Sequence, residues 1–182
     1  GMGYTSVDPQ IILSDSEESK RKLSEVIASM LGQSDIKTKN VAINLPSQKT
    51  FTTIIEVPNQ DKKELARNIE YQVDQYIPMS LDDAKFDWAL IGASLSKQDY
   101  LEILLASTSK KFSEEKMEFV EGLGLNVVAS EPESLAMTRA LYSGEIENRA
   151  QLFVNFNETS TDLSIVCQGA PRLVRTSPAG LF

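Results

Sequence analysis

The chain has 182 residues, of which 41% are hydrophobic and 24% are charged, as in a globular protein of one or two domains. Its formal net charge of −8 argues against nucleic acid as the main partner, because phosphate binding needs clustered Lys and Arg. It has no histidine, which removes the usual zinc ligand and the usual general base near neutral pH. The single Cys167 cannot form an intrachain disulfide, so the cytosol is the expected compartment.

The first third of the chain contains one helical pattern and two strand patterns. Ser14 and Asp15, with glutamates three residues on, form a capping box, and apolar residues then recur at helical spacing until Gly32. Two runs rich in Val, Ile, Thr and Phe follow, and a proline ends each of them. The elements expected here are an irregular segment 1–14, a helix from 17 to Gly32, and strands at 41–45 and 49–57.

The middle of the chain follows the order strand, helix, strand, strand. Asp61 with Glu64 opens a helix, and Pro78 ends it because the residue before a proline avoids helical geometry. Two apolar runs separated by a polar loop then predict a hairpin. The elements expected here are a helix over 61–76 and strands over 85–91 and 100–106, so that 48–107 forms one strand–helix–strand–strand unit.

The last third changes from mixed helices and strands to strands alone. Ser130-Glu-Pro-Glu133 combines a capping box with a proline in the first turn, which predicts a helix start. Three short runs after this helix, separated by polar turns, predict a meander in a new sheet. The elements expected here are helices at 113–122 and from 130 to about 144, and strands at 125–129, 151–156, 161–167 and 172–176.

The end of the helix over 61–76 is the most informative segment. The apolar side chains at this helix end must be buried, either in the chain's own core or by a partner. The hydroxyl of Tyr76 favours a position with access to solvent. For Ile77, packing in the core and contact with a partner are equally compatible with the sequence. The candidate partner-binding residues are Gln72, Tyr76, Ile77, Pro78 and Met79.

Acidic residues follow this segment but do not predict a metal site. Asp82, Asp83 and Asp87 lie in a turn and at the start of a strand, where carboxylates are usually solvated. No second ligand group converges on them in the sequence, so we expect no bound metal.

Three segments of the sequence resemble the PilM-type type IV pilus assembly proteins, an actin-like family related to the cell-division protein FtsA. Asn40-Val-Ala-Ile-Asn-Leu-Pro-Ser47 resembles the family's strand and Leu-Pro turn. The stretch 70–83 resembles its helix ending in Gln-Tyr-Ile-Pro, and Glu131-Pro-Glu-Ser-Leu-Ala136 resembles its acidic helix-opening segment. The resemblance covers about 36–180.

The resemblance implies an α/β fold, namely part of the actin-like ATPase architecture with an inserted α+β subdomain. The first lobe would comprise 1–47 and 108–149, and the inserted strand–helix–strand–strand subdomain would be 48–107. Residues 150–182 would begin the second lobe. Because the sequence stops within this meander, we expect a piece of a longer protein rather than a reduced relative.

The resemblance also implies two phosphate-holding hairpins that begin with Asp-x-Gly, and the sequence departs from both. Nothing in 1–35 resembles the first. In the second, Asn155 lacks the carboxylate that would hold magnesium, and Asn157 has a side chain where glycine is expected. Thr159 and Ser160 remain as cofactor-binding candidates of a degenerate hairpin. We therefore expect no cofactor and no ATPase activity, with ATP and magnesium possible only in a full-length relative.

By resemblance, the chain is a cytoplasmic adaptor of type IV pilus assembly, peripheral at the inner membrane through its partners. A groove between the parent lobe and the inserted subdomain would take the short cytoplasmic tail of the inner-membrane protein PilN, and other pilus assembly components would also bind. The alternatives are a nucleotide-binding actin-like ATPase, or the equivalent component of type II secretion or of FtsA-like cell division. These proteins share a fold, so partner identity separates them.

Overall fold

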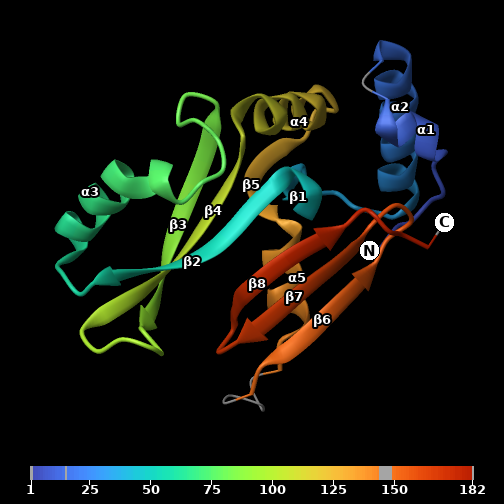
Figure 1. Ribbon diagram of the computed structural model, residues 1–182. Helices are drawn as coiled ribbons and strands as arrows, with labels where there is room; N and C mark the ends of the chain where they lie inside the picture. Colours follow the sequence, from blue (N-terminus) through green and yellow to red (C-terminus); the bar gives the residue numbers. More distant parts are fainter. Residues whose placement is uncertain (1, 15, 144–148, 182) are drawn as a thin grey trace. The chain divides into compact units, whose positions relative to one another are not determined.

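The computed structural model describes residues 2–14, 16–143 and 149–181 (Figure 1). The chain divides into two compact units, one made of 1–43 and 114–129 and the other of 44–113 and 130–182. These units group the residues differently from the lobes and the inserted subdomain expected from the sequence, and that division stays a prediction.

The first unit begins with two helices, α1 (Pro9–Leu13) and α2 (Glu17–Gln33). The expected irregular segment 1–14 is irregular at 2–8, but the prediction was wrong at 9–13, where Asp8 caps a short helix by accepting a hydrogen bond from the Gln10 N–H at 2.9 Å. The N-cap of α2 is Ser16 rather than Ser14, since the Ser16 Oγ accepts from the Ser19 N–H at 3.2 Å. The expected cap Asp15 lies outside the described residues.

The expected end of α2 at Gly32 was one residue early. The helix continues to Gln33, where Ser34 closes it by donating from both its N–H and its hydroxyl to the Met30 carbonyl, at 3.0 and 2.7 Å. These two hydrogen bonds satisfy a carbonyl at the helix end and make a glycine stop unnecessary.

Strands β1 (Asn40–Leu45) and β5 (Asn126–Pro132) form a two-stranded sheet. They begin side by side, because the Asn126 N–H donates to the Lys39 carbonyl at 2.7 Å. Strand β5 runs three residues further than expected, and α5 (Glu133–Leu141) begins directly after Pro132, which has no side-chain cap. The expected capping box at Ser130 is therefore wrong, since strand geometry continues through that residue.

The second unit contains a three-stranded antiparallel sheet covered on one face by a helix (Figure 1). Its strands are β2 (Thr50–Pro58), β4 (Tyr100–Ser109) and β3 (Ala84–Ala93), in that spatial order. The covering segment is α3 (Lys62–Gln72) followed by the single 3₁₀ turn η2 (Val73–Gln75). Strands and helix follow the predicted chain order, and the core between them contains Ile55, Val57, Leu65, Ile69, Val73, Ile77, Ile103 and Leu105.

Helix α4 (Lys110–Gly122) begins three residues earlier than expected, because β4 leads into it without a loop. The Lys110 N–H donates to the Asp83 carbonyl at 2.7 Å at this junction. The acidic turn before β3 therefore supports the start of α4.

The last three strands form the predicted meander: β6 (Gln151–Phe156), β7 (Thr161–Cys167) and β8 (Ala170–Ser177), antiparallel and in chain order. The β7–β8 turn uses Gln168 and Gly169, both with positive φ, at 52° and 73°. Helix α5 packs against β8.

Candidate partner-binding site

The predicted helix-end segment is divided between core and surface. Ile77 is 6% exposed and packs with Val73 and Leu105, so it contributes to the core rather than to a contact surface. Tyr76 and Met79 are half-buried and pack against this cluster, which we call the Ile77 cluster. Gln72 is half-buried and Pro78 is exposed. Only part of the segment is therefore available to a partner.

The end of the segment is fixed by its own backbone. The N–H groups of Tyr76 and Ile77 both donate to the Val73 carbonyl, at 3.0 and 3.1 Å. The chain thus turns tightly before Pro78, which has no N–H and cannot continue the helical hydrogen bonds.

A cavity of about 190 Å³ lies at one end of the β2–β4–β3 sheet, and we call it the sheet-end cavity. Phe86 and Ala106 contribute from β3 and β4. Leu45 and Pro132, the last residues of β1 and β5, contribute apolar surface from outside the sheet. The cavity is mostly apolar, which suits side chains rather than an ion.

Two serines in this cavity have no hydrogen-bond partner among the described residues. Ser107 and Ser113 are 3% and 1% exposed, and the Oγ atom of each is buried and unpaired. A buried hydroxyl without a partner costs about 1–3 kcal/mol. Neither Oγ atom is exposed to the cavity, so a ligand that offers backbone N–H or carbonyl groups would pair with these hydroxyls only after the serine side chains turn towards it.

The predicted segment lies behind this cavity and not in it. Phe86 packs against the Ile77 cluster and also lines the cavity. None of the five predicted partner-binding residues lines the cavity itself. Phe86, Ser107 and Ser113 were not predicted as site residues. Ser107 is followed by Thr108 and Ser109, and Ser113 is followed by Glu114 and Glu115, so the sequence gives no sign that either serine is buried.

Tyr76 lines a different feature, a shallow groove of about 660 Å³ beside β2. Glu56 lies in this groove and accepts hydrogen bonds from Ser94, from Ser96 at 2.5 Å and from the Lys97 ammonium at 3.1 Å. These bonds, led by that from Ser94, lower the pKa of Glu56 from the ordinary 4.5 to about 2. The Glu56 carboxylate is therefore ionised at neutral pH and holds the β3–β4 loop.

The hairpin between β6 and β7 carries the phosphate-site candidates, and their side chains bond to one another. Asn155 Nδ2 donates to Asn157 Oδ1 at 3.2 Å, and Asn157 Nδ2 donates to Asp162 Oδ2 at 2.9 Å. Asp162, which the sequence analysis did not single out, is buried and also accepts from Thr176 Oγ1 at 2.5 Å. The Asn157 N–H donates to the Ser160 carbonyl at 2.8 Å, which closes the turn.

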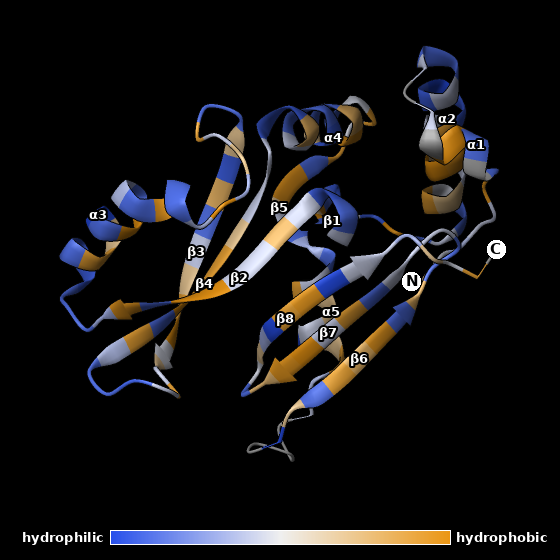
Figure 2. Ribbon diagram, in the orientation of Figure 1, coloured by the Kyte–Doolittle hydropathy of each residue, from blue (hydrophilic) through white to orange (hydrophobic). Residues whose placement is uncertain are grey.

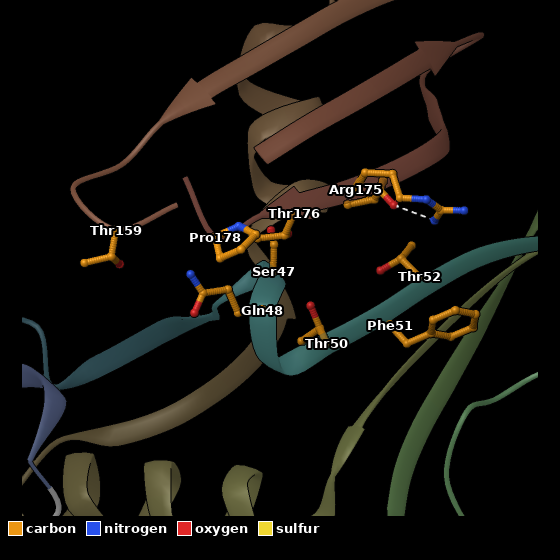
Figure 3. Close-up of a pocket in the computed structure, with 10 residues that line it drawn as sticks. Ser47, Gln48, Thr50, Phe51, Thr52, Thr159, Arg175, Thr176 and Pro178 are labelled. Carbon is orange, nitrogen blue, oxygen red and sulfur yellow. Dashed lines mark hydrogen bonds between the residues drawn. The ribbon is translucent and has the colours of Figure 1, made fainter. Parts of the chain in front are cut away.

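Thr159 faces a third cavity, of about 550 Å³ (Figure 3). Ser47, Thr50 and Thr52 lie on one side of it, and Arg175 and Thr176 lie on the β8 side. This cavity offers hydroxyls and one cation but no carboxylate to bind magnesium. Within the described ranges, no cluster of three or more His, Cys, Asp or Glu residues could hold a metal ion.

Comparison with solved structures identifies the fold. The chain is similar to the PilM–PilN type IV pilus biogenesis complex, with 19% identity, a TM-score of 0.80, and coverage of 97% of this chain and 53% of that chain. It is also similar to the cytoplasmic domain of EpsL, an inner-membrane component of the type II secretion system of Vibrio cholerae. That match has 11% identity, a TM-score of 0.57, and coverage of 88% of this chain and 56% of that chain.

The chain thus spans about half the length of both structures. The similarities confirm the predicted α/β class and the partial actin-like architecture. None of the helices in the described ranges is both long and apolar enough to cross a membrane. A family model for the type IV pilus assembly protein PilM matches residues 2–172, nearly the whole sequence. The chain belongs to the PilM family of type IV pilus assembly proteins.

Proposed function

We propose that this chain is a cytoplasmic adaptor of type IV pilus assembly that binds the short tail of a PilN-like inner-membrane protein in the sheet-end cavity. The observation that carries the proposal is the pair of unpaired buried hydroxyls, Ser107 and Ser113, in a mostly apolar cavity. The similarity to the PilM–PilN complex supports the class of partner. The partner would hold the chain at the membrane.

An extended peptide provides what the cavity lacks. One apolar side chain would pack against Phe86, Leu45 and Pro132, and the peptide backbone would pair with the two serine hydroxyls. Each hydrogen bond so formed contributes about 1 kcal/mol net.

The five residues predicted from the sequence have two roles in this proposal. Tyr76, Ile77 and Met79 act indirectly, because their cluster fixes the position of Phe86. Gln72 and Pro78 have free surface at the helix end and remain candidates for direct contact with the tail.

We infer that the chain does not bind or hydrolyse ATP. The β6–β7 hairpin has an amide at Asn155 where a carboxylate would hold magnesium, and its nearby carboxylate, Asp162, is engaged with Asn157 and Thr176. These residues do not fit a magnesium–nucleotide complex. The type II secretion alternative is less well supported, because the EpsL match has the lower TM-score and the PilM family model matches the chain.

The test is calorimetric titration with a synthetic N-terminal peptide of a PilN-like membrane protein from the same organism as this chain. We expect saturable binding, and we expect Ser113→Ala to weaken it about 5- to 10-fold, equivalent to the roughly 1 kcal/mol of one hydrogen bond. Thermal unfolding of the free variant should be unchanged or at a higher temperature, because the substitution removes an unpaired buried hydroxyl.

The matched control is Ser134→Ala. Ser134 is also a buried serine with an unpaired hydroxyl, but it does not line the sheet-end cavity, so peptide affinity should stay that of the wild type. Absence of saturable binding by the folded wild type, or equal weakening by both serine variants, would refute this site.

A further inference from the structure

The junction between β4 and α4, where the strand passes into the helix without a loop, forms one wall of the sheet-end cavity. Ser107 and Thr108 line the cavity from the end of β4, and Ser113 lines it from the start of α4. Figure 2 shows that the chain changes from hydrophobic along β4 to hydrophilic at the start of α4. Hydrogen bonds, more than apolar packing, therefore fix where the helix begins.

The first N–H of α4 has its acceptor outside the helix. The Lys110 N–H donates to the Asp83 carbonyl at 2.7 Å. The first N–H groups of a helix have no acceptor within it, so an outside carbonyl can tie the helix start to a neighbouring segment. The last ladder pair of β3 and β4 at this end is Ala84 opposite Ser109, and Asp83 and Lys110 are the next residues of the two segments. The hydrogen bond thus continues the sheet by one step into the helix.

The Asp83 carbonyl belongs to a turn that is held by its own side chains. Ser80 Oγ donates to Asp83 Oδ2 at 2.8 Å, and the Asp83 N–H donates to the Ser80 carbonyl at 3.2 Å and to its Oγ at 3.3 Å. On either side of the turn, Met79 and Ala84 pack against the Ile77 cluster. The turn therefore joins the predicted helix-end segment to the start of α4.

The end of β4 is also bound on its other side. Thr108, which is 5% exposed, donates from its Oγ1 to the Lys49 carbonyl at 2.7 Å, just before β2 begins. Within the junction, Ser109 Oγ accepts from the Phe112 N–H at 3.4 Å. Together with the Asp83 carbonyl, these contacts fix the direction in which α4 leaves the sheet.

We propose that Asp83 and Lys110 are positioning residues of the sheet-end cavity, and that the hydrogen bond between their backbones sets its α4 wall for the tail. This inference rests on the function proposed above. Ser113 lies three residues after Lys110 and hence on the same side of the helix, so a shift of the first turn moves the Ser113 hydroxyl. A displacement of about 1 Å is enough to weaken a hydrogen bond to a bound peptide.

The test is calorimetric titration with the PilN-like tail peptide, repeated with Lys110→Pro. Proline lacks the N–H and so removes the contact, yet it is favoured at the first position of a helix and after a residue in strand geometry such as Ser109. We expect the dissociation constant to rise about fivefold, the equivalent of one lost hydrogen bond. Lys110→Ala is the conservative variant: it removes the same charged side chain, keeps the N–H and should bind like the wild type.

A second pair of variants tests the turn. Asp83→Ala removes the acceptor of the Ser80 hydroxyl and should raise the dissociation constant about two- to threefold, whereas Asp83→Asn keeps an acceptor oxygen and should restore the wild-type value. The control for lost stability alone is Arg172→Ala, which breaks an ion pair with Glu102 near the opposite end of β4. Measured well below its unfolding temperature, this variant should keep the wild-type affinity.

A failure of the positioning role differs from a failure of the cavity as the tail site. If the wild type binds the tail and Lys110→Pro binds it equally well, or if Lys110→Ala weakens binding as much as Lys110→Pro does, the positioning role is overturned and the cavity stands. Equal weakening by Lys110→Pro and Arg172→Ala would show an effect of stability alone and would also overturn it. Absence of binding by the folded wild type would overturn the proposed function, and this inference with it.

Discussion

The guanidinium of Arg172 on β8 donates to the carboxylate of Glu102 on β4, and this ion pair joins the meander to the β2–β4–β3 sheet. Glu102 is 5% exposed, and its other oxygen accepts from the Leu95 N–H at 3.2 Å. Arg172 Nε donates to the Cys167 carbonyl at 3.3 Å, while its Nη2 atom is buried without a partner among the described residues. Both charged groups are largely removed from water, so each would be left without compensation for its lost hydration if the other were removed.

Arg172→Ala is therefore expected to lower the free energy of unfolding by about 3 kcal/mol, because it leaves the Glu102 carboxylate buried and unpaired. Urea denaturation measures this loss. The double variant Arg172→Leu with Glu102→Leu should regain most of the stability, since a buried ion pair can often be replaced by apolar residues at little cost. A single variant within about 0.5 kcal/mol of the wild type would show that the pair contributes little.

The lowered pKa of Glu56 predicts how the stability of the fold depends on pH. Its folded-state pKa of about 2 lies below the ordinary 4.5, so its ionised form stabilises the fold above pH 4.5, and that contribution is lost as pH falls towards 2. Urea midpoints of the wild type and Glu56→Gln should therefore differ at pH 7 and converge between pH 4.5 and 2. The exposed Glu70→Gln is the control. A difference that does not change with pH would show that the hydrogen bonds of Glu56 do not depend on its charge.

Local signals in the sequence predict most of the elements of this fold. Pro46 directly follows the last residue of β1, and Pro58 is the last residue of β2. Alternation of apolar and polar residues predicts β3, because one face of its sheet is buried. Boundaries were missed where neighbouring residues compete, as at Ser16, which caps α2 in place of Ser14. In such cases several hydroxyls have the right spacing, and the folded backbone selects one.

The site was less predictable, because its residues come together only through the fold. Ser107 belongs to β4 and Leu45 to β1, and nothing in either local sequence shows that they share a cavity. The same is true of Glu102 and Arg172, which are 70 residues apart. Ile77 was predictable as apolar but not as buried, since the sequence does not show which face of the helix end meets Leu105.

The β6–β7 hairpin provides a further test of the polar network. Asn157→Ala removes the amide that donates to Asp162 at 2.9 Å and leaves a buried carboxylate short of a partner, so we expect a loss of about 1–3 kcal/mol in unfolding free energy. Asn155→Ala removes only the 3.2 Å bond to Asn157 and should cost less. Equal losses for the two variants in thermal or urea unfolding would show that the hydrogen bond to Asp162 contributes no more than the bond between Asn155 and Asn157.

The helix-end segment can be tested for its division between core and surface. Ile77→Ala should lower unfolding free energy by about 2–5 kcal/mol, because it leaves a cavity beside Val73 and Leu105. Ile12→Ala, at a position 59% exposed, is the matched control and should change stability by less than about 0.5 kcal/mol. Because the Ile77 cluster also holds Phe86, the folded Ile77→Ala variant should bind the tail peptide more weakly than the wild type, measured well below its unfolding temperature. Unchanged affinity with reduced stability would show that the cluster does not act on the sheet-end cavity, and Tyr76 would again be a candidate for direct contact, beside Gln72 and Pro78.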